Sequence, residues 1–427
     1  MNSLTPKSGL QQKQIILDRI TSVVFILILV ELSLGGGGRL TAVGSISLRM
    51  VLFCIAILLS GFHLILGRRL SSIQLNLLLM YSVVLAVGLA CGILLGAERK
   101  FWWEDVKPLS YFFILPFFSF AVKDLQRVHL SAAILKSSGA ILACCFLVLL
   151  LLIHTNIIPF LNFYQHVIHT EEFFFRGQLT FFYKGFLFLC LSFLFIYFTG
   201  WHARRLWLIL EGVAIVLTVT RGLWFALLSV LAIYHALNMK RKAITFVILS
   251  CAVLFLGHTL VVSASKFVDI AQLRLHGKSY STLNTTLLGD RTHSDNGRFQ
   301  QIKEVTNAIT LPSFFIGHGF GNGVPSRPIH MEISYVEIFH KQGIVGLLFW
   351  FFLLYQVWQQ YKNAPPGNLR EAYFFSCVFI FAQSLTNQYI NNPIGLSMVL
   401  LCLVCLEKLR TQEKDITDKS IITNFKV

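Results

Sequence analysis

Long apolar segments separated by short polar turns occupy most of this chain. A helix needs roughly 20 apolar residues to cross a bilayer, and most of the segments approach that length. The pattern predicts about twelve spans, which makes an all-α polytopic membrane protein the expected fold class. The predicted spans lie at residues 19–35, 46–66, 73–96, 108–122, 131–153, 179–200, 204–219, 222–238, 244–262, 342–358, 371–389 and 394–409.

One long polar break interrupts the pattern. It covers residues 263–341 and contains several Arg and His side chains, with runs that predict short amphipathic helices. The break divides the chain into an N-terminal membrane bundle of about nine spans at 1–262, a large loop, and C-terminal spans with a tail at 342–427. Because ionisable side chains concentrate in the loop, we expect active-site residues there.

The composition agrees with a membrane protein and argues against nucleic-acid binding. Hydrophobic residues make up 55% of the chain and charged residues only 13%, whereas soluble domains carry about 25% charged residues. The formal net charge is +16, but the basic residues form short clusters between apolar runs. The histidines show no established zinc-binding spacing, so neither a metal nor a cofactor is expected.

The basic clusters predict the orientation, because cytoplasmic loops carry an excess of Lys and Arg. A cytoplasmic N-terminus places these clusters on the cytoplasmic side: Arg68/Arg69, Lys123/Arg127, Arg204/Arg205, Lys240/Arg241/Lys242, Lys362/Arg370 and Lys408/Arg410. The C-terminus is then cytoplasmic too, and the loop at 263–341 faces outward, which for a bacterial cell means the periplasm. Since ATP and nucleotide sugars are absent there, we expect a lipid-linked, already activated substrate.

Two arginines stand out on the expected outer side. Arg221 lies in VLTVTRGLWFALL, where one span ends and the next begins. A charge at the hydrocarbon edge is costly unless it is paired or solvated, so Arg221 is either a snorkelling interfacial residue or a cation for an anionic headgroup. Arg298 follows the turn-forming Asp295-Asn296-Gly297 and is expected in the first turn of a surface helix, with a plain solvated charge as the alternative.

A third candidate group follows Pro328. A helix beginning there would place His330, Ser334, Glu337 and Lys341 on one face. A His and a Glu on one face can supply a general base and the group that orients it, or a donor to phosphate oxygens. A satisfied structural polar face is the alternative.

Other conspicuous features receive structural interpretations. The glycines at 317–323 do not have the G-x-G-x-x-G spacing, which favours a flexible or close-packed loop over a nucleotide site. The four glycines at 35–38 predict a tight or mobile turn. Glu211, in the middle of a predicted span, is a costly membrane acid that suggests a basic partner on a neighbouring helix.

Three of these segments resemble one family. The stretch IHMEISYVEIFHKQGIVGLL is similar to the His-led, Glu-containing signature of the O-antigen ligase/polymerase superfamily, the Wzy/WaaL-type proteins. TVTRGLWFALL resembles the family's T-x-S-R-G junction, with Thr220 where Ser is usual, and SDNGRFQQI resembles its loop arginine. The expected spans and loop match the family's plan along nearly the whole chain. His330 is followed by Met-Glu rather than by the frequent His-Asn, and the Arg-to-Gly repeat of some polymerases is missing.

The resemblance implies a GT-C-like bundle and a metal-independent, inverting glycosyltransferase. Its donor would be an undecaprenyl-diphosphate-linked glycan at the periplasmic face. Arg221 and Arg298 would hold the diphosphate, and His330 would contact the leaving phosphate or take the proton of the acceptor, so these three are the catalytic candidates. The further candidates for substrate binding are Arg291, Arg327, Glu337 and Arg176.

The expected function is that of a polysaccharide polymerase for O-antigen or exopolysaccharide. The main alternative is an O-antigen ligase that transfers the glycan to the lipid A core, which uses the same donor. A transporter or flippase for a lipid-linked glycan is the alternative from another class, and it would distribute polar residues through the spans. The expected partners are the lipid-linked oligosaccharide, an acceptor glycan, membrane lipids, and a flippase and a chain-length regulator.

Overall fold

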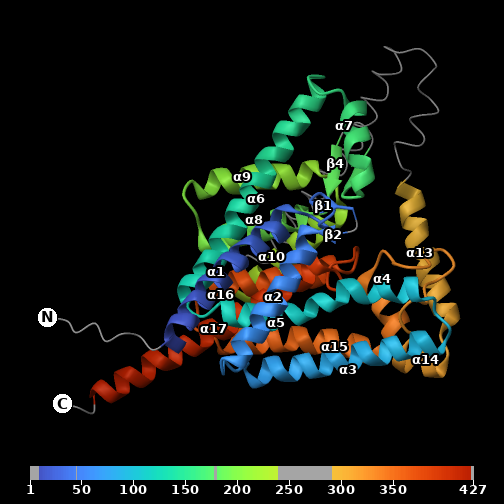
Figure 1. Ribbon diagram of the computed structural model, residues 1–427. Coiled ribbons are helices and arrows are strands. Elements are labelled where there is room, and N and C mark those ends of the chain that lie inside the picture. The colour runs from blue at the N-terminus through green and yellow to red at the C-terminus, as the bar shows by residue number, and fades with distance from the viewer. Residues whose placement is uncertain (1–8, 45, 177–179, 239–290, 425–427) are drawn as a thin grey trace, which may run out of the picture.

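A computed structural model describes residues 9–44, 46–176, 180–238 and 291–424, and the fold is mostly helical (Figure 1). The first half contains α1 (Gly9–Leu34), α2 (Leu48–Ile65), α3 (Ser72–Leu94), α4 (Arg99–Leu109), the 3-10 helix η1 (Ser110–Ile114), α5 (Leu115–Ala121), α6 (Leu125–His154), α7 (Phe160–Val167), η2 (Ile168–Thr170), α8 (Phe186–Thr199), α9 (Arg204–Leu217) and α10 (Arg221–Asn238). The second half contains α13 (Arg291–Ala308), α14 (Leu311–Ile316), α15 (Ser334–Asn363), α16 (Asn368–Gln383) and α17 (Pro393–Asn424).

The expected spans within the described residues coincide with helices, although several bounds differ. Among the described helices four, α2, α3, α6 and α15, are long and apolar enough to cross a membrane, and α8 is a shorter apolar helix. The expected span at 244–262 lies outside the described residues, as do residues 263–290 of the expected loop. A mostly helical membrane protein is therefore confirmed, whereas the number of twelve spans and the division into three regions stay predictions.

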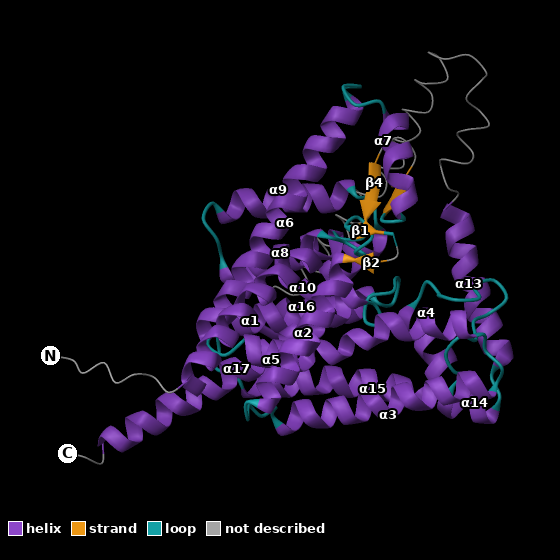
Figure 2. Ribbon diagram, in the orientation of Figure 1, coloured by secondary structure: helices purple, strands orange, loops and turns teal. Residues whose placement is uncertain are grey.

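Two short hairpins depart from the all-α expectation. Strand β1 (Ala42–Val43) pairs with β2 (Ile46–Ser47), and β3 (Phe173–Arg176) pairs with β4 (Thr180–Tyr183), both antiparallel. Figure 2 shows the two hairpins close together. In the second hairpin three of the four cross-strand pairs are aromatic on both strands, and such pairs stabilise a ladder. The expected span at 179–200 was therefore wrong at its start, and its helix α8 begins only at Phe186.

The core surrounds α8. This helix is apolar on every side and almost completely buried between α6 and α16, as expected for a helix without a polar face. At the periphery, α3 and α15 run side by side from the centre of the bundle toward α4, α13 and α14 (Figure 1). Helix α1 begins, and α17 ends, on the opposite side of the molecule from those three helices.

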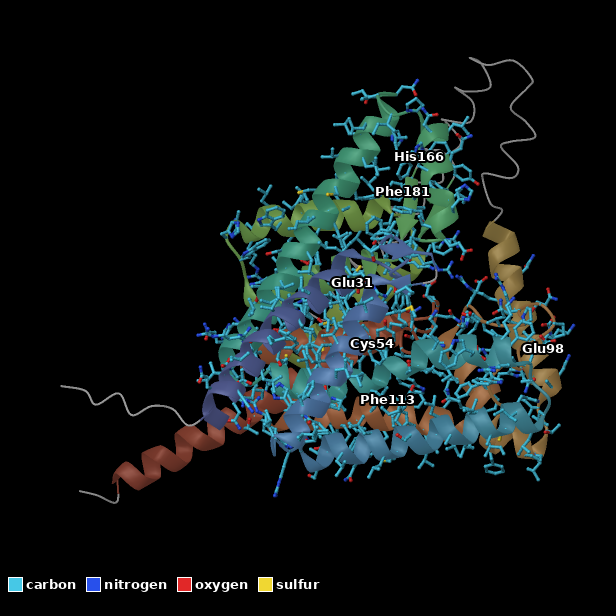
Figure 3. The ribbon with its side chains drawn as sticks, in the orientation of Figure 1. Glu31, Cys54, Glu98, Phe113, His166 and Phe181 are labelled. Carbon is cyan, nitrogen blue, oxygen red and sulfur yellow. The ribbon has the colours of Figure 1, made fainter. Side chains whose placement is uncertain are left out.

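The four-glycine turn is tight. The Glu172 carboxylate accepts hydrogen bonds from the backbone of Gly37 at 2.6 Å and of Arg39 at 3.0 Å. The buried Arg49 donates to the Gly36 carbonyl at 2.6 Å and to Glu31 at 2.8 Å, inside the bundle (Figure 3). The glycines thus allow the backbone to wrap around buried charges, which decides between the tight and the mobile interpretation.

Glu211 has a hydroxyl partner in place of the basic one suggested by its position. Its buried carboxylate accepts a hydrogen bond from Ser192 Oγ of α8 at 2.6 Å. Within the described residues no basic side chain forms an ion pair with it. A hydrogen bond to a neutral group therefore takes the place of the suggested ion pair.

The glycine loop at 317–323 packs directly on α3. Phe320 is fully buried, and its backbone N–H donates to the Gly88 carbonyl at 2.9 Å. A Cβ atom at Gly92 would overlap the backbone of Phe320, so only glycine allows this approach. The loop is therefore close-packed, as one of the two interpretations of its glycines predicted.

The contact between Gly92 and Phe320 predicts that a larger residue at position 92 lowers the stability of the protein. Gly92→Ala should destabilise the protein by about 1–3 kcal/mol, because the added methyl group forces the Phe320 backbone away from α3. Gly61→Ala is the matched control, since no atom lies within 4 Å of the added Cβ in α2. Thermal unfolding of the purified protein should show a lower midpoint for Gly92→Ala and an unchanged or higher one for Gly61→Ala. Equal midpoints for the two variants would contradict the close packing.

Candidate active site

Four charged or ionisable side chains meet where α4 approaches the start of α15. The Lys341 ammonium donates to Asp105 Oδ1 and to Glu337 Oε1, each at 2.6 Å, and also to the Ile329 carbonyl. His330 Nδ1 lies 3.4 Å from Glu337 Oε1 and 3.6 Å from Asp105 Oδ1. Lys341, Asp105 and Glu337 are buried, whereas the His330 side chain is 43% exposed. His330 is therefore the member of this cluster that a substrate can reach.

The geometry of helix α15 explains why two of the four side chains, Glu337 and Lys341, lie together. Glu337 and Lys341 are one turn apart in α15, so their side chains share a face. His330 does not share that face as predicted, because the helix begins at Ser334 rather than directly after Pro328. The irregular segment before the helix contains bends and brings the imidazole to Glu337. The predicted proximity of His330 and Glu337 is thus present, but its structural cause is different.

Further hydrogen bonds fix the two carboxylates. Gln388 Nε2 and Asn391 Nδ2 both donate to Glu337 Oε2 at 2.6 Å, and the Gly321 backbone N–H donates to Asp105 Oδ2 at 2.7 Å. Burial raises the pKa of the Asp105 carboxyl, and the adjacent Lys341 ammonium opposes this shift. Neither Asp105 nor the two amides was predicted as a site residue from the sequence. The polar run TNQYINN at 386–392, at the end of an expected span, was a signal that could have revealed the amides.

The cluster also contains a potential metal-binding set. One ligand atom each from Asp105, His330 and Glu337 lies within 4.8 Å of the others. The Lys341 ammonium, at 2.6 Å from both acids, fills the place that a divalent cation would take between them. These residues therefore suit an internal ammonium better than a metal ion, since a cation in contact with both acids would repel Lys341.

A second cluster of charges lies beside His330. One carboxylate, that of Glu332, accepts from Arg298 Nε at 2.9 Å and from Arg327 Nη2 at 2.7 Å. The arginine side chains are 31% and 51% exposed, respectively. Arg298 lies in the middle of α13 rather than in its first turn, because the helix begins at Arg291 and includes the expected turn residues. The structure thus brings two of the predicted arginines next to the turn that carries His330.

Two more contacts attach α13 to this turn. The Glu332 backbone N–H donates to Gln301 Oε1 at 2.9 Å. Glu304 Oε2 accepts from the backbone and the hydroxyl of Ser326, at 3.0 and 2.6 Å, and these hydrogen bonds lower the pKa of Glu304. The position of Arg298 relative to His330 is therefore determined by several polar contacts and does not depend on Glu332 alone.

Arg221 belongs to a strained junction. It is the first residue of α10 and is exposed, and the preceding Val219 has a φ of +53°, which is unfavourable for a β-branched residue. The next residue, Gly222, packs so closely on the end of α16 that an added Cβ would lie 2.5 Å from Thr386 Oγ1. Thr386 opens the segment 386–392 whose amides bind Glu337. Arg221 thus stands next to the segment that supports the His330 cluster.

Two predicted residues are placed by their backbones only. Arg176 ends β3 opposite Thr180, and the Thr180 hydroxyl donates to the Leu217 carbonyl at 2.7 Å, close to the Arg221 junction. Arg291 begins α13. The side chains of both arginines lie outside the described part of the structure, so their predicted contact with substrate stays a prediction.

Comparison with known proteins finds similarity to proteins of O-antigen assembly. Residues 206–351 match the family model described as O-antigen ligase. The chain is also 24% identical over 393 residues to the O-antigen polymerase of Shigella flexneri, an alignment that covers 90% of this chain and 94% of that protein. The chain is therefore similar to O-antigen ligases over that segment and to an O-antigen polymerase over most of its length. The resemblance on which the sequence analysis relied is thereby confirmed.

The segment that matches the O-antigen ligase family model contains most of the candidate site residues. Arg221, Arg298, His330 and Glu337 all lie between residues 206 and 351. Asp105 and the amides of Gln388 and Asn391 lie outside it, and they reach Lys341 and Glu337 through the fold. The surrounding helices therefore complete a site whose other members come from the family segment.

Because the Lys341 ammonium occupies the place of a metal ion, removal of this side chain should create a metal-binding site. Lys341→Ala removes the cation but leaves the carboxylates and the imidazole in place, so the variant should melt below the wild type and should bind Co²⁺. We expect Co²⁺ to raise its melting temperature and to produce a visible absorption band, with no such response in the wild type. The double variant Asp105→Asn/Lys341→Ala is the control, because it loses one ligand. An equal response of wild type and Lys341→Ala would refute the placement of the ammonium.

Proposed function

We propose that this protein is a glycosyltransferase of polysaccharide assembly, which polymerises repeat units linked to undecaprenyl diphosphate. The observation that carries the proposal is the position of two half-exposed arginines beside an accessible histidine. Arg298 and Arg327 meet on Glu332, two residues from His330. This arrangement combines cations for an anionic leaving group with a group that can move a proton.

The arginines would bind the diphosphate of the donor. A guanidinium group presents a planar fork of donors that suits phosphate oxygens, and the Arg298 and Arg327 side chains are both partly exposed. A diphosphate carries more charge than the single Glu332 carboxylate and would compete with it for these donors. Arg221, beside the supporting segment, would add a third cation. Charge stabilisation of the departing diphosphate then supplies electrostatic catalysis without a metal ion.

His330 would act on the acceptor. Its Nδ1 faces Glu337 and Asp105, which leaves Nε2 for the substrate. A carboxylate at one imidazole nitrogen orients the ring and favours the acceptance of a proton at the other nitrogen. The acceptor hydroxyl would attack the anomeric carbon and transfer its proton to Nε2, while the bond to the diphosphate breaks with inversion.

The proposed location is the bacterial inner membrane, with both termini in the cytoplasm and the site facing the periplasm. Three of the basic clusters that predict this orientation line one cavity, through Arg68, Lys123 and Lys408. Helices α4 and α13 of the candidate site lie on the opposite side from the start of α1 and the end of α17 (Figure 1). Both observations agree with loops that sort to two faces by charge. A flippase and a chain-length regulator would act with the protein on the same lipid-linked glycan.

A ligase is the second candidate function, because the matching family model is described by that name. The alignment with the Shigella flexneri polymerase, which covers nearly both chains, favours polymerisation. Both reactions use the same donor and differ only in the acceptor. The transporter alternative receives less support, because the charged clusters of the site gather around α4, α13 and the start of α15 instead of following the spans.

A reconstituted reaction separates the two functions. The purified protein should convert an undecaprenyl-diphosphate oligosaccharide into a ladder of longer products without any lipid A core, and addition of EDTA should leave the ladder unchanged. Gel electrophoresis of the released glycans measures the products. Products formed only with lipid A core would identify a ligase, and a loss of activity in EDTA that Mg²⁺ restores would contradict the role given to the arginines.

Substitutions test the residues in the same assay. Arg298→Ala and His330→Ala should each reduce transfer by about a hundredfold or more, because they remove charge stabilisation or proton transfer. Arg205→Ala, an exposed arginine at the start of α9, is the control and should retain the wild-type rate. Equal protein levels and melting temperatures exclude misfolding. Normal chain lengths from either site variant would eliminate that residue from the mechanism.

A further inference from the structure

A cavity lies at the end of α3 that is remote from the candidate active site. The helix ends near the glycine loop and Asp105, whereas its first turn borders a cavity of about 460 Å³. The 23 residues of α3 separate the two sites by roughly 35 Å, about the thickness of a membrane's hydrocarbon core. The cavity therefore belongs to the expected cytoplasmic face and is separate from the candidate active site.

The lining of the cavity carries an excess of positive charge. Arg68, Arg69, Lys123 and Lys408 come from three separate parts of the chain, and Glu407 is the acid among the lining residues. Asp18 of α1 lies behind two of the cations, at 2.7 Å from Arg68 and 3.5 Å from Lys123.

The other two cations have no such neighbour among the side chains that the structure describes. Within the described residues, neither Arg69 nor Lys408 pairs with an acidic side chain. A bound anion would therefore find two available cations in one cavity.

The cavity also presents a buried hydrogen-bonding group that is only partly satisfied. Gln74 is 3% exposed and donates to Glu407 at 2.7 Å, while its Oε1 atom has no hydrogen-bond partner among the described residues. A buried acceptor without a partner is costly. A ligand hydroxyl that entered the cavity could satisfy it. Leu70, Phe120 and Val404 line the same cavity and add apolar surface.

We propose that this cavity binds the headgroup of an anionic phospholipid from the cytoplasmic leaflet, with phosphatidylglycerol as the fitting chemistry. The phosphodiester would lie between Arg69 and Lys408, a glycerol hydroxyl would donate to Gln74, and the acyl chains would follow the apolar part of the lining. Basic pockets between helices at this membrane face suit such headgroups. The assignment of the face rests on the orientation given under the proposed function, whereas binding itself does not depend on the transfer reaction.

Lipid binding can be measured on the full-length protein in detergent. Native mass spectrometry with added short-chain phosphatidylglycerol should show one tightly bound lipid, and phosphatidylcholine should bind at least about tenfold more weakly. The double variant Arg69→Gln/Lys408→Gln should lose at least about tenfold in affinity for phosphatidylglycerol. Arg205→Gln/Lys362→Gln removes the same charge elsewhere on the expected cytoplasmic side and should bind as the wild type does.

Three other results of the lipid-binding experiment would each contradict the proposal. Equal losses in both double variants would mean that the total charge, and not this cavity, attracts lipid. Competition by inorganic phosphate or glycerol phosphate at the concentration of the lipid would identify a site for soluble anions. Equal binding of phosphatidylcholine would remove the role of the cations. Transfer activity measured on the same preparations is a separate readout, because a protein that binds lipid but transfers no glycan would contradict only the proposed function.

Discussion

The Lys341 ammonium is the contact on which the candidate site depends. Its three hydrogen bonds go to α4 through Asp105, to the segment before α15 through Ile329, and to α15 itself through Glu337. Removal of one partner from a buried ion pair costs about 3–5 kcal/mol, because the remaining charge stays buried without compensation. Here one cation compensates two acids, so its removal would leave like charges facing each other. His330 is positioned by the same carboxylates, and its orientation therefore depends on the ammonium.

The backbone around Lys341 is shaped to permit this contact. Gly343 has a φ of +64° and interrupts α15 directly after the first turns, and its close approach to the backbone of Phe315 excludes any Cβ. The interruption frees the carbonyls of His340 and Lys341, which accept from the backbone N–H groups of His318 and Gly319 at 2.7 and 3.0 Å. The glycine loop is thus fixed to α15 on one side and to α3 on the other. From this position Gly321 reaches Asp105, so the glycines serve packing around the ion cluster rather than phosphate binding.

Local sequence patterns predicted the helices and the site residues whose positions depend on residues nearby in the chain. The apolar segments predicted most helices, and a single region predicted both His330 and Glu337. Arg298 was found through its turn residues, although its helix begins earlier. Asp105 could not be found in this way, because 236 residues separate it from Lys341 and only packing brings them together. Glu332 was missed for a related reason, since an acid next to a predicted base has no visible role until two distant arginines meet on it.

The two charge clusters differ in a way that bears on function. Around Lys341, both oxygens of both carboxylates already have hydrogen-bond donors, so a substrate gains little by entering that network. Around Glu332, one carboxylate that is 24% exposed accepts from two arginines whose side chains are 31% and 51% exposed. A satisfied buried network gives a fixed geometry, and partly exposed guanidinium groups are accessible to an incoming anion. His330 connects the two clusters, because its Nδ1 faces the carboxylates around Lys341 and its backbone lies two residues from Glu332. That position suits a residue whose orientation must be constant while its partner changes during the reaction.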